Sequence, residues 1–179
     1  MLDSYFPDPK HTAEWQDHLT WGDIVSFRFP VEGDPEAVLE PKKRPCLVID
    51  RRVIGALPYV TLAFGTSAYH QKTRGYGVDI IKPARVISAG LHQPTRFICY
   101  RKVSVPLNHI GFIHSKAIES PVLGSLSGPE FERMNQVRAR LQAEADIAAE
   151  HRVRRRIYGR RKAKPLTFAV EYTRRKRLT

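Results

Sequence analysis

A pair of apolar, β-rich runs around a glycine-containing connector most constrains how this chain can fold. The runs cover residues 45–50 and 58–64, and the connector is centred near Gly55. Two such runs on either side of a short polar turn predict an antiparallel hairpin. If the hairpin is symmetric about Gly55, Arg44 and Thr66 lie opposite one another at its open end, with Cβ atoms about 5 Å apart. A slip of one residue would place them diagonally or on opposite faces.

Both faces of this hairpin are apolar, which predicts two central strands. One face carries Cys46, Val48, Val60, Leu62 and Phe64, and the other carries Leu47, Ile49, Tyr59 and Ala63. Strands that are apolar on both faces are normally covered on both sides. We therefore expect one face to line a barrel interior and the other to be covered by another element or by a partner.

Further short strands are predicted around the hairpin. Residues 21–30 alternate like a strand that is buried on one face, residues 78–81 form a short strand, and residues 95–105 form another strand or a bent pair. Residues 84–94 are expected to be a loop with weak β character. Several short strands with turns between them predict a small antiparallel barrel. The long stretch at residues 31–43 is either a binding loop or a surface excursion.

A helical pattern replaces the strand pattern after Ser127. Ser127 and Glu130 fit a capping box at the start of the helix. Apolar residues then recur at helical spacing, at Phe131, Met134, Val137, Leu141, Ala145 and Ala148. This amphipathic helix, ending near Glu150, is expected to pack on the barrel or on a second copy of itself. A basic helical extension and a strand at residues 166–172 are expected to follow.

The fold class expected from these patterns is mainly β with α: a small antiparallel barrel with a C-terminal amphipathic helix and a basic tail. The predicted divisions are an N-terminal arm at residues 1–20, the barrel at 21–114, a linker and helix at 115–150, and the tail at 151–179. The arm is either loose or ordered by docking, and residues 12–19 are predicted to form a short helix.

Positive charge is concentrated in the tail. Residues 151–179 hold twelve Lys and Arg residues and one acid, so they carry +11 of the formal net charge of +12. Such a segment favours a polyanion, because each phosphate that it neutralises releases counterions. Nucleic acid is therefore the first expected partner and an anionic membrane surface the second. RNA contacts are expected from Arg154, Arg155, Arg156, Arg160 and Arg161. A solvated polybasic end is the alternative.

Other features restrict the location and the chemistry. No run approaches the roughly 18 apolar residues of a spanning helix, and residues 1–11 carry acids and prolines where a signal peptide has basic residues. We therefore expect a cytoplasmic protein without a membrane partner. Cys46 and Cys99 lie in apolar runs and are expected to be reduced, buried thiols. The histidines and cysteines show no zinc-site spacing, so neither a metal nor a cofactor is expected.

The candidate site consists of Arg44, Thr66, Ser67 and the polar loop that follows them. A guanidinium presents a rigid fork of donors to phosphate oxygens, and a hydroxyl can donate to a phosphoryl oxygen. Together they could stabilise the charge that develops when an RNA 2′-hydroxyl attacks its own phosphodiester. This reaction needs neither a metal nor an external nucleophile. A purely structural interpretation is also open, in which Arg44 pairs with an acid and Thr66 caps a turn.

Four short motifs occur along the chain in a characteristic order. They are Gly22-Asp23-Ile24, Arg44-Pro45, Thr66-Ser67 and Val78-Asp79-Ile80. Over residues 21–112 the chain resembles the MazF/PemK-like toxin family of bacterial toxin–antitoxin systems. The resemblance implies an SH3-like barrel, usually a homodimer, that cleaves single-stranded RNA without a metal. It also implies that a cognate antitoxin protein silences the activity.

The resemblance further implies individual roles. Arg44 would be the catalytic arginine and phosphate clamp, and Thr66 the catalytic hydroxyl residue, with possible support from Ser67 and from His70, the nearest titratable group. Lys42, Lys43, Lys72 and Arg74 would grip the RNA. The chain lacks the glycine that many members carry next to the arginine, and residues 127–179 lie outside the resemblance. The alternative function is a non-catalytic nucleic-acid-binding adaptor barrel with an Arg-rich tail.

Overall fold

The computed structural model describes residues 9–12, 14–30, 41–68, 73–114 and 119–159. The chain forms two compact units, Met1–Leu141 and Gln142–Thr179. The elements are η1 (Pro9–His11), α1 (Trp15–His18), β1 (Asp23–Arg28), β2 (Lys43–Ile54), β3 (Leu57–Thr66), β4 (Gly77–Ile80), α3 (Pro83–Ser88), β5 (Thr95–Pro106), β6 (Val122–Ser125) and α4 (Gly128–Gly159). The boundary between the two units falls within α4.

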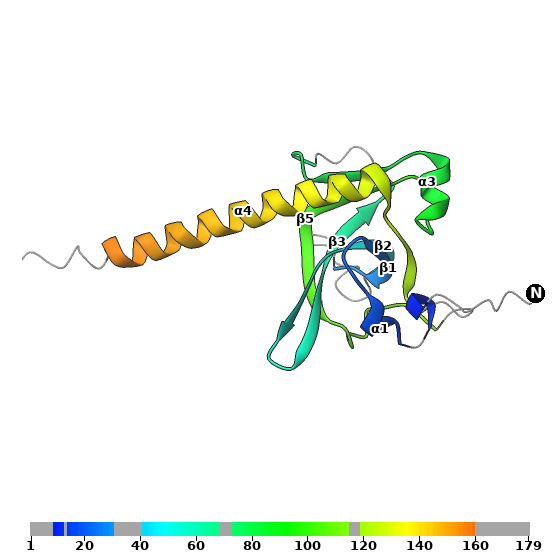
Figure 1. Ribbon diagram of the computed structural model, residues 1–179, viewed down its shortest axis with the longest axis horizontal. Coiled ribbons are helices and arrows are strands. Elements are labelled where there is room, and N and C mark those ends of the chain that lie inside the picture. Colours follow the sequence, from blue (N-terminus) through cyan, green and yellow to red (C-terminus); the bar gives the residue numbers. More distant parts are fainter. Residues whose placement is uncertain (1–8, 13, 31–40, 69–72, 115–118, 160–179) are drawn as a thin grey trace, which may run out of the picture. The chain divides into compact units, whose positions relative to one another are not determined.

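The first unit is built around one antiparallel sheet. Its six strands are ordered β4-β5-β3-β2-β1-β6, and the sheet curls into a half-barrel (Figure 1). The protein is therefore mainly β with a C-terminal helix, as the sequence predicts. The strands β2 and β3 lie in the middle of the sheet, which confirms the prediction that the hairpin is central.

The register of the β2–β3 hairpin follows the prediction at its open end. Cys46 pairs with Phe64 and Val48 pairs with Leu62. Nearer the turn the pairing shifts by one residue, so that Ile54 pairs with Leu57. A bulge after Val48 absorbs the extra residue, as β-bulges do. The predicted symmetry about Gly55 is therefore recovered on the side where Arg44 and Thr66 lie.

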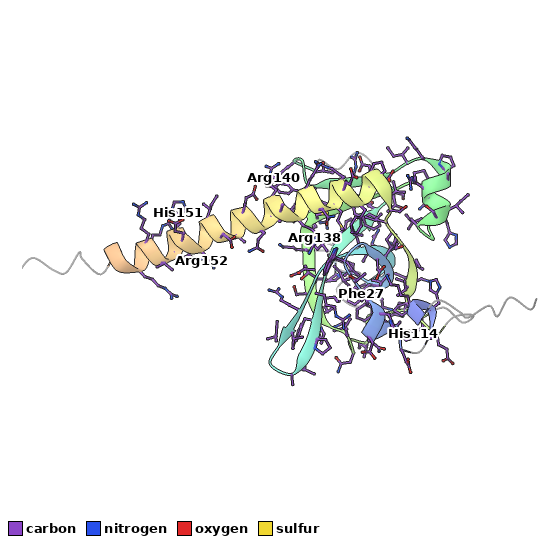
Figure 2. The ribbon with its side chains drawn as sticks, viewed as in Figure 1. Phe27, His114, Arg138, Arg140, His151 and Arg152 are labelled. Carbon is purple, nitrogen blue, oxygen red and sulfur yellow. The ribbon has the colours of Figure 1, made fainter. Side chains whose placement is uncertain are left out.

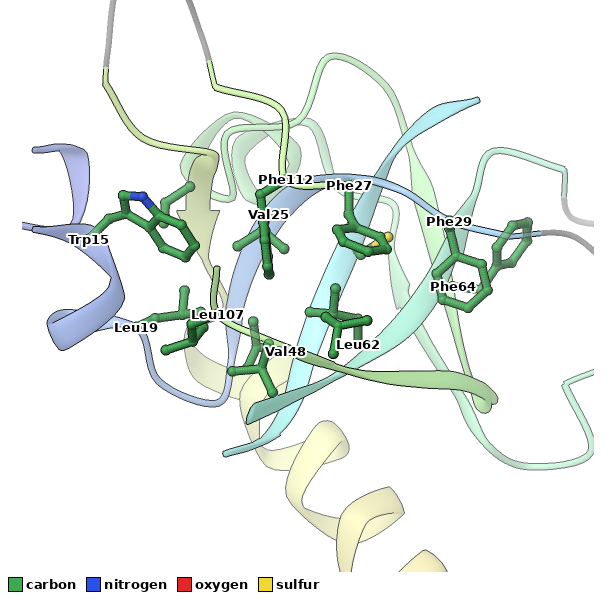
Figure 3. Close-up of a cluster of buried hydrophobic side chains, with 14 of the residues drawn as sticks. Trp15, Leu19, Val25, Phe27, Phe29, Val48, Leu62, Phe64, Leu107 and Phe112 are labelled. Atoms are coloured by element: carbon green, nitrogen blue, oxygen red, sulfur yellow. The ribbon is translucent and has the colours of Figure 1, made fainter. Parts of the chain in front are cut away.

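Two hydrophobic clusters pack on opposite faces of the hairpin, as its two apolar faces predict. The first contains Cys46, Val48, Val60, Leu62 and Phe64, and Figure 3 shows it with Phe29 and Phe64 side by side at one end. The second contains Leu47, Ile49 and Ala63 from the hairpin. Met134 and Val137 of α4 complete this second cluster, so the helix covers this face. Packing of the helix on the barrel, one of the two predicted alternatives, is therefore observed.

Strand β1 corrects the expectation of a strand that is buried on one face. Val25 and Phe27 belong to the first cluster, whereas Ile24 belongs to the second. Ser26, on the face that was expected to be exposed, is 2% exposed. The reason is that a hydrophobic cluster packs on each face of the sheet at β1, so both faces of the strand are covered.

Two elements differ from the sequence prediction. Residues 84–94 do not form a loop with β character, because α3 occupies the first part of this stretch. The linker predicted after residue 114 contains β6, which pairs with β1. The sheet therefore extends beyond the predicted end of the barrel.

The packed face of α4 is shorter than the sequence pattern predicts. Met134 and Val137 are buried, and Leu141 is half-buried. Ala145 and Ala148, which continue the same apolar spacing, are exposed. At the start of the helix, the two residues of the predicted capping box both contact Arg85: Ser127 Oγ accepts a hydrogen bond of 2.9 Å, and the Glu130 carboxylate lies 3.7 Å from Arg85 Nε.

The described part of the N-terminal arm is docked on the barrel. Trp15 and Leu19 are each 1% exposed and belong to the first cluster, and the Trp15 ring lies 5.0 Å from that of Phe112. The structure thus selects docking over a loose arm for these residues. The strand predicted at residues 166–172 lies outside the described residues. Within the described parts of the chain, no helix has both the length and the apolar character needed to cross a bilayer.

Both cysteines are free, buried thiols, as predicted. Burial raises the pKa of Cys46 and of Cys99 from 9.0 to about 12. We therefore expect both thiols to resist a thiol-specific reagent at about pH 8 and to react once the protein is unfolded. Because the folded-state pKa is raised, their contribution to stability is complete below pH 9.0 and is lost as the pH rises towards 12. Rapid labelling of the folded protein would contradict this expectation.

Candidate functional site

A pocket of about 290 Å³ lies at the open end of the β2–β3 hairpin. Its first wall is formed by Lys43, Arg44 and Pro45 at the start of β2 and by Gly65, Thr66 and Ser67 at the end of β3. The hairpin register explains this arrangement, because both segments lie directly beyond Cys46 and Phe64, the outermost pair between β2 and β3. The structure therefore brings Arg44, Thr66, Ser67 and Lys43 together, as the sequence analysis expects.

The guanidinium of Arg44 is held against an aromatic ring. Its Cζ atom lies 5.2 Å from the centre of the Phe64 ring, and the Cζ atom of Arg101 lies 4.2 Å from the same ring. Phe29 packs against Phe64 from within the first cluster, at 5.3 Å between ring centres. Cation–ring contacts of this kind stabilise a guanidinium in one orientation. The ring thus positions Arg44 at the edge of the pocket.

Two polar atoms of the pocket residues are buried without a hydrogen-bond partner among the described residues. They are Nε of Arg44 and Oγ of Ser26. The backbone of Ser26 is fully used, because its N–H donates to Pro121 and its carbonyl accepts from Ile113. A buried donor without a partner costs about 1–3 kcal/mol. Arg44 and Ser26 both line the pocket and each carries a hydrogen-bond donor, so the pocket is suited to an anionic oxygen.

Thr66 is fixed by a turn at the end of β3. It is 7% exposed, and its Oγ1 accepts a hydrogen bond of 3.1 Å from the backbone N–H of Ala68. A hydroxyl that accepts in this way still has its own hydrogen to donate. Thr66 therefore does form the turn contact of the structural interpretation, and it also lines the pocket.

The second wall of the pocket is the segment that follows α3. It consists of Gly90, Leu91, His92, Gln93 and Thr95, and Leu123 of β6 lies next to it. Leu91 and Thr95 are buried, whereas His92 and Gln93 between them are exposed. Thr95 Oγ1 donates a hydrogen bond of 3.0 Å to the carbonyl of Gln93. The backbone N–H of Leu91 donates a hydrogen bond of 2.9 Å to the carbonyl of Val86. These contacts fix the segment on both sides of His92.

Gly90 allows this wall to approach β6 closely. Its φ is +66°, and a Cβ added there would lie 1.8 Å from the carbonyl oxygen of Leu123. A left-handed conformation costs a non-glycine residue about 1–2 kcal/mol. We expect Gly90→Ala to destabilise the protein by more than this, because the added Cβ also clashes with the carbonyl of Leu123. Gly55→Ala is the matched control, because Gly55 has a φ of +65° with nothing within 4 Å of the added Cβ. Equal losses in urea unfolding would contradict this role for Gly90.

The remaining predicted site residues are placed elsewhere or lie outside the described residues. Lys42 is exposed and does not line the pocket. Arg74 is also outside the pocket lining and lies over the Tyr100 ring at 5.9 Å. His70, Lys72, Arg160 and Arg161 lie outside the described residues. Arg154, Arg155 and Arg156 are exposed on α4 in the second unit, as is Arg152, which Figure 2 labels.

The sequence analysis missed Ser26 and His92 as pocket residues. Ser26 lies between the apolar residues Val25 and Phe27 of β1, and this apolar flank was the signal for its burial. His92 carries no local signal, because its place in the pocket depends on how the segment after α3 packs against β6.

Neither a metal cluster nor a related protein identifies the site. In the described residues, no group of three or more His, Cys, Asp or Glu side chains is arranged to hold a metal ion. No protein-family model matches the sequence, and no curated protein matches it.

Proposed function

We propose that this protein is an endoribonuclease that cleaves single-stranded RNA by attack of the 2′-hydroxyl on the adjacent phosphodiester. The observation that carries the proposal is that Arg44, Ser26 and Thr66 line one pocket, and that Arg44 Nε and Ser26 Oγ have no hydrogen-bond partner among the described residues. Donors held in place before the reaction stabilise negative charge as it develops in a transition state. The pocket volume of about 290 Å³ suits a single nucleotide-sized group.

The proposed reaction uses the substrate's own nucleophile. The 2′-oxygen forms a bond to phosphorus, and the bond between phosphorus and the 5′-oxygen breaks. The products are a 2′,3′-cyclic phosphate and a 5′-hydroxyl end. Arg44 and Ser26 would donate to the non-bridging oxygens, and the Thr66 hydroxyl would orient the same phosphate. The reaction then needs no metal, because the nucleophile is already part of the substrate.

The likeness to the MazF/PemK-like toxins supports the same function and adds further proposals. Its four motifs include Arg44-Pro45 and Thr66-Ser67, which both line the pocket. On this basis we propose an SH3-like toxin barrel that acts in the cytoplasm as a homodimer. A cognate antitoxin would inhibit it. A small acidic antitoxin would suit this chain, which carries a formal net charge of +12.

The direct test is cleavage of mixed-sequence, single-stranded RNA by the purified full chain in EDTA. We expect fragments with 5′-hydroxyl and 2′,3′-cyclic phosphate ends, and no cleavage of DNA of the same sequence. Intact RNA at every enzyme concentration, or fragments with 5′-phosphate ends, would contradict the proposal.

A second candidate function is supported by the exposed basic residues of α4. Arg152, Arg154, Arg155 and Arg156 are all exposed, and a run of this kind binds nucleic acid through its phosphates. This function is a non-catalytic adaptor that retains RNA. It predicts salt-dependent RNA binding without strand scission. Replacing Arg154, Arg155 and Arg156 by glutamine in the full chain should weaken this salt dependence. Cleavage in EDTA that persists after this replacement would count against the adaptor.

A further inference from the structure

Arg44, Ser26 and Thr66, which are proposed to bind the phosphate, do not supply a base for the proposed reaction. Attack by a 2′-hydroxyl is faster when a neighbouring group takes its proton. The Arg44 guanidinium stays charged at every physiological pH. The hydroxyls of Ser26 and Thr66 donate hydrogen bonds and do not act as bases near neutral pH. These groups can bind the phosphate, but they cannot accept the proton.

The second wall carries one side chain of the required kind. Histidine is the residue that exchanges a proton near neutral pH, and His92 lines the pocket with Arg44 and Thr66. The other charged residues of the pocket lining are Lys43 and Arg44, both from β2, and the lining residues from β1, β3 and β6 are uncharged. No carboxylate is among the described residues that line the pocket.

The position of His92 is set by its neighbours in the chain. Leu91 is 7% exposed and Thr95 is 2% exposed, so the segment is anchored on both sides. The close approach of Gly90 to Leu123 holds the same segment against β6. His92 itself is exposed. An exposed imidazole on a fixed backbone at the pocket wall is accessible both to a bound substrate and to water.

Building on the proposed ribonuclease function, we propose that His92 is the general base of the reaction. A neutral imidazole nitrogen takes the proton of the 2′-hydroxyl while the 2′-oxygen bonds to phosphorus. The electron pair of the breaking bond goes to the 5′-oxygen, which takes a proton from water. The imidazolium then returns its proton to solvent. His70, which the sequence suggests only as possible catalytic support because it is the titratable residue nearest to Thr66, is the competing candidate.

The test compares three full-length variants on single-stranded RNA under single-turnover conditions. We expect His92→Ala to cleave about 100-fold more slowly or worse, because general base catalysis contributes about 10²–10⁴-fold. His18→Ala is the matched control, because His18 is exposed on α1 and does not line the pocket. His70→Ala tests the competitor. The wild-type rate should rise with pH near neutrality, and His92→Ala should lose this rise.

Two further measurements separate catalysis from a structural role. Imidazole added to the buffer should restore part of the rate of His92→Ala, which it would not do for a misfolded wall. A substrate with sulfur in place of the 5′-oxygen should not rescue the variant, because the base acts on the 2′-hydroxyl. Rescue by that substrate, or an unchanged pH profile in an active His92→Ala variant, would overturn the role of His92 but leave the proposed ribonuclease function standing. An inactive wild-type protein would overturn the proposed function as well.

Discussion

Arg44→Ala should abolish RNA cleavage while leaving the protein folded. Loss of one preorganised donor to a developing charge typically costs about 10²–10³ in rate, and Arg44 also supplies the positive charge at the pocket edge. We therefore expect a loss of at least about 100-fold. The fold should tolerate the change, because Nε of Arg44 has no hydrogen-bond partner among the described residues. Single-turnover cleavage and the thermal unfolding midpoint would be measured together.

The chain offers a matched control for Arg44. The guanidinium of Arg101 lies over the same Phe64 ring, at 4.2 Å, but Arg101 does not line the pocket. Arg101→Ala removes a similar cation–ring contact and should change the cleavage rate only a few-fold. Arg44→Lys keeps the charge and loses the planar fork, so it should recover little activity. Near-normal cleavage by Arg44→Ala, or an equal loss in Arg101→Ala, would remove Arg44 from the proposed mechanism.

The largest effect on stability is expected at Asp23. This carboxylate is 1% exposed; it forms an ion pair of 2.7 Å with Lys10 and accepts a hydrogen bond of 2.7 Å from the backbone N–H of Thr20. The contacts tie the N-terminal segment to the start of β1. Removing one partner of a fully buried ion pair costs about 3–5 kcal/mol, and the low end of this range applies here because the Lys10 side chain is 27% exposed. We expect a loss of this size for Asp23→Ala, measured by urea unfolding.

Asp79 provides the comparison for Asp23. Its ion pair with Arg96 has the same 2.7 Å distance, but its side chain is 33% exposed. The pair is bidentate, with two hydrogen bonds of 2.7 Å, but a partly exposed ion pair contributes less than a buried one, so Asp79→Ala should cost less than Asp23→Ala. A double-mutant cycle with Lys10→Met would isolate the coupling between Lys10 and Asp23. Similar losses at Asp23 and Asp79 would show that burial of Asp23 does not govern its contribution.

The central hairpin could be predicted from the sequence because its information is local. The alternating apolar pattern fixed which side chains share a face, whereas the pairing nearest the turn is shifted by one residue from the predicted symmetry about Gly55. The bulge after Val48 was not predicted, yet it restored the assumed symmetry at the open end. Arg44 and Thr66 therefore came together as expected. The two-sided burial of Leu47 and Val48 was predictable for the same reason.

The missed elements depend on contacts between distant parts of the chain. Helix α3 has six residues, which are too few for a helical period to be visible in the sequence. Val86 is the residue of α3 that is buried. Strand β6 has four residues and is defined by its pairing with β1. The second wall of the pocket forms where the segment after α3 meets β6 at Gly90 and Leu123. No local pattern encodes that meeting, so His92 could not be assigned to the site from sequence alone.

The most direct test of the proposed mechanism uses a single atom of the substrate. Once the cleavage site in a mixed-sequence RNA has been mapped, the same RNA is made with one 2′-hydroxyl replaced by hydrogen, on the nucleotide before the scissile bond. Transesterification predicts that the wild-type protein binds this RNA normally and leaves that bond intact, while it still cuts the unmodified RNA in EDTA. Cleavage at the modified position would show that the nucleophile is not the 2′-hydroxyl, and would contradict the proposed mechanism.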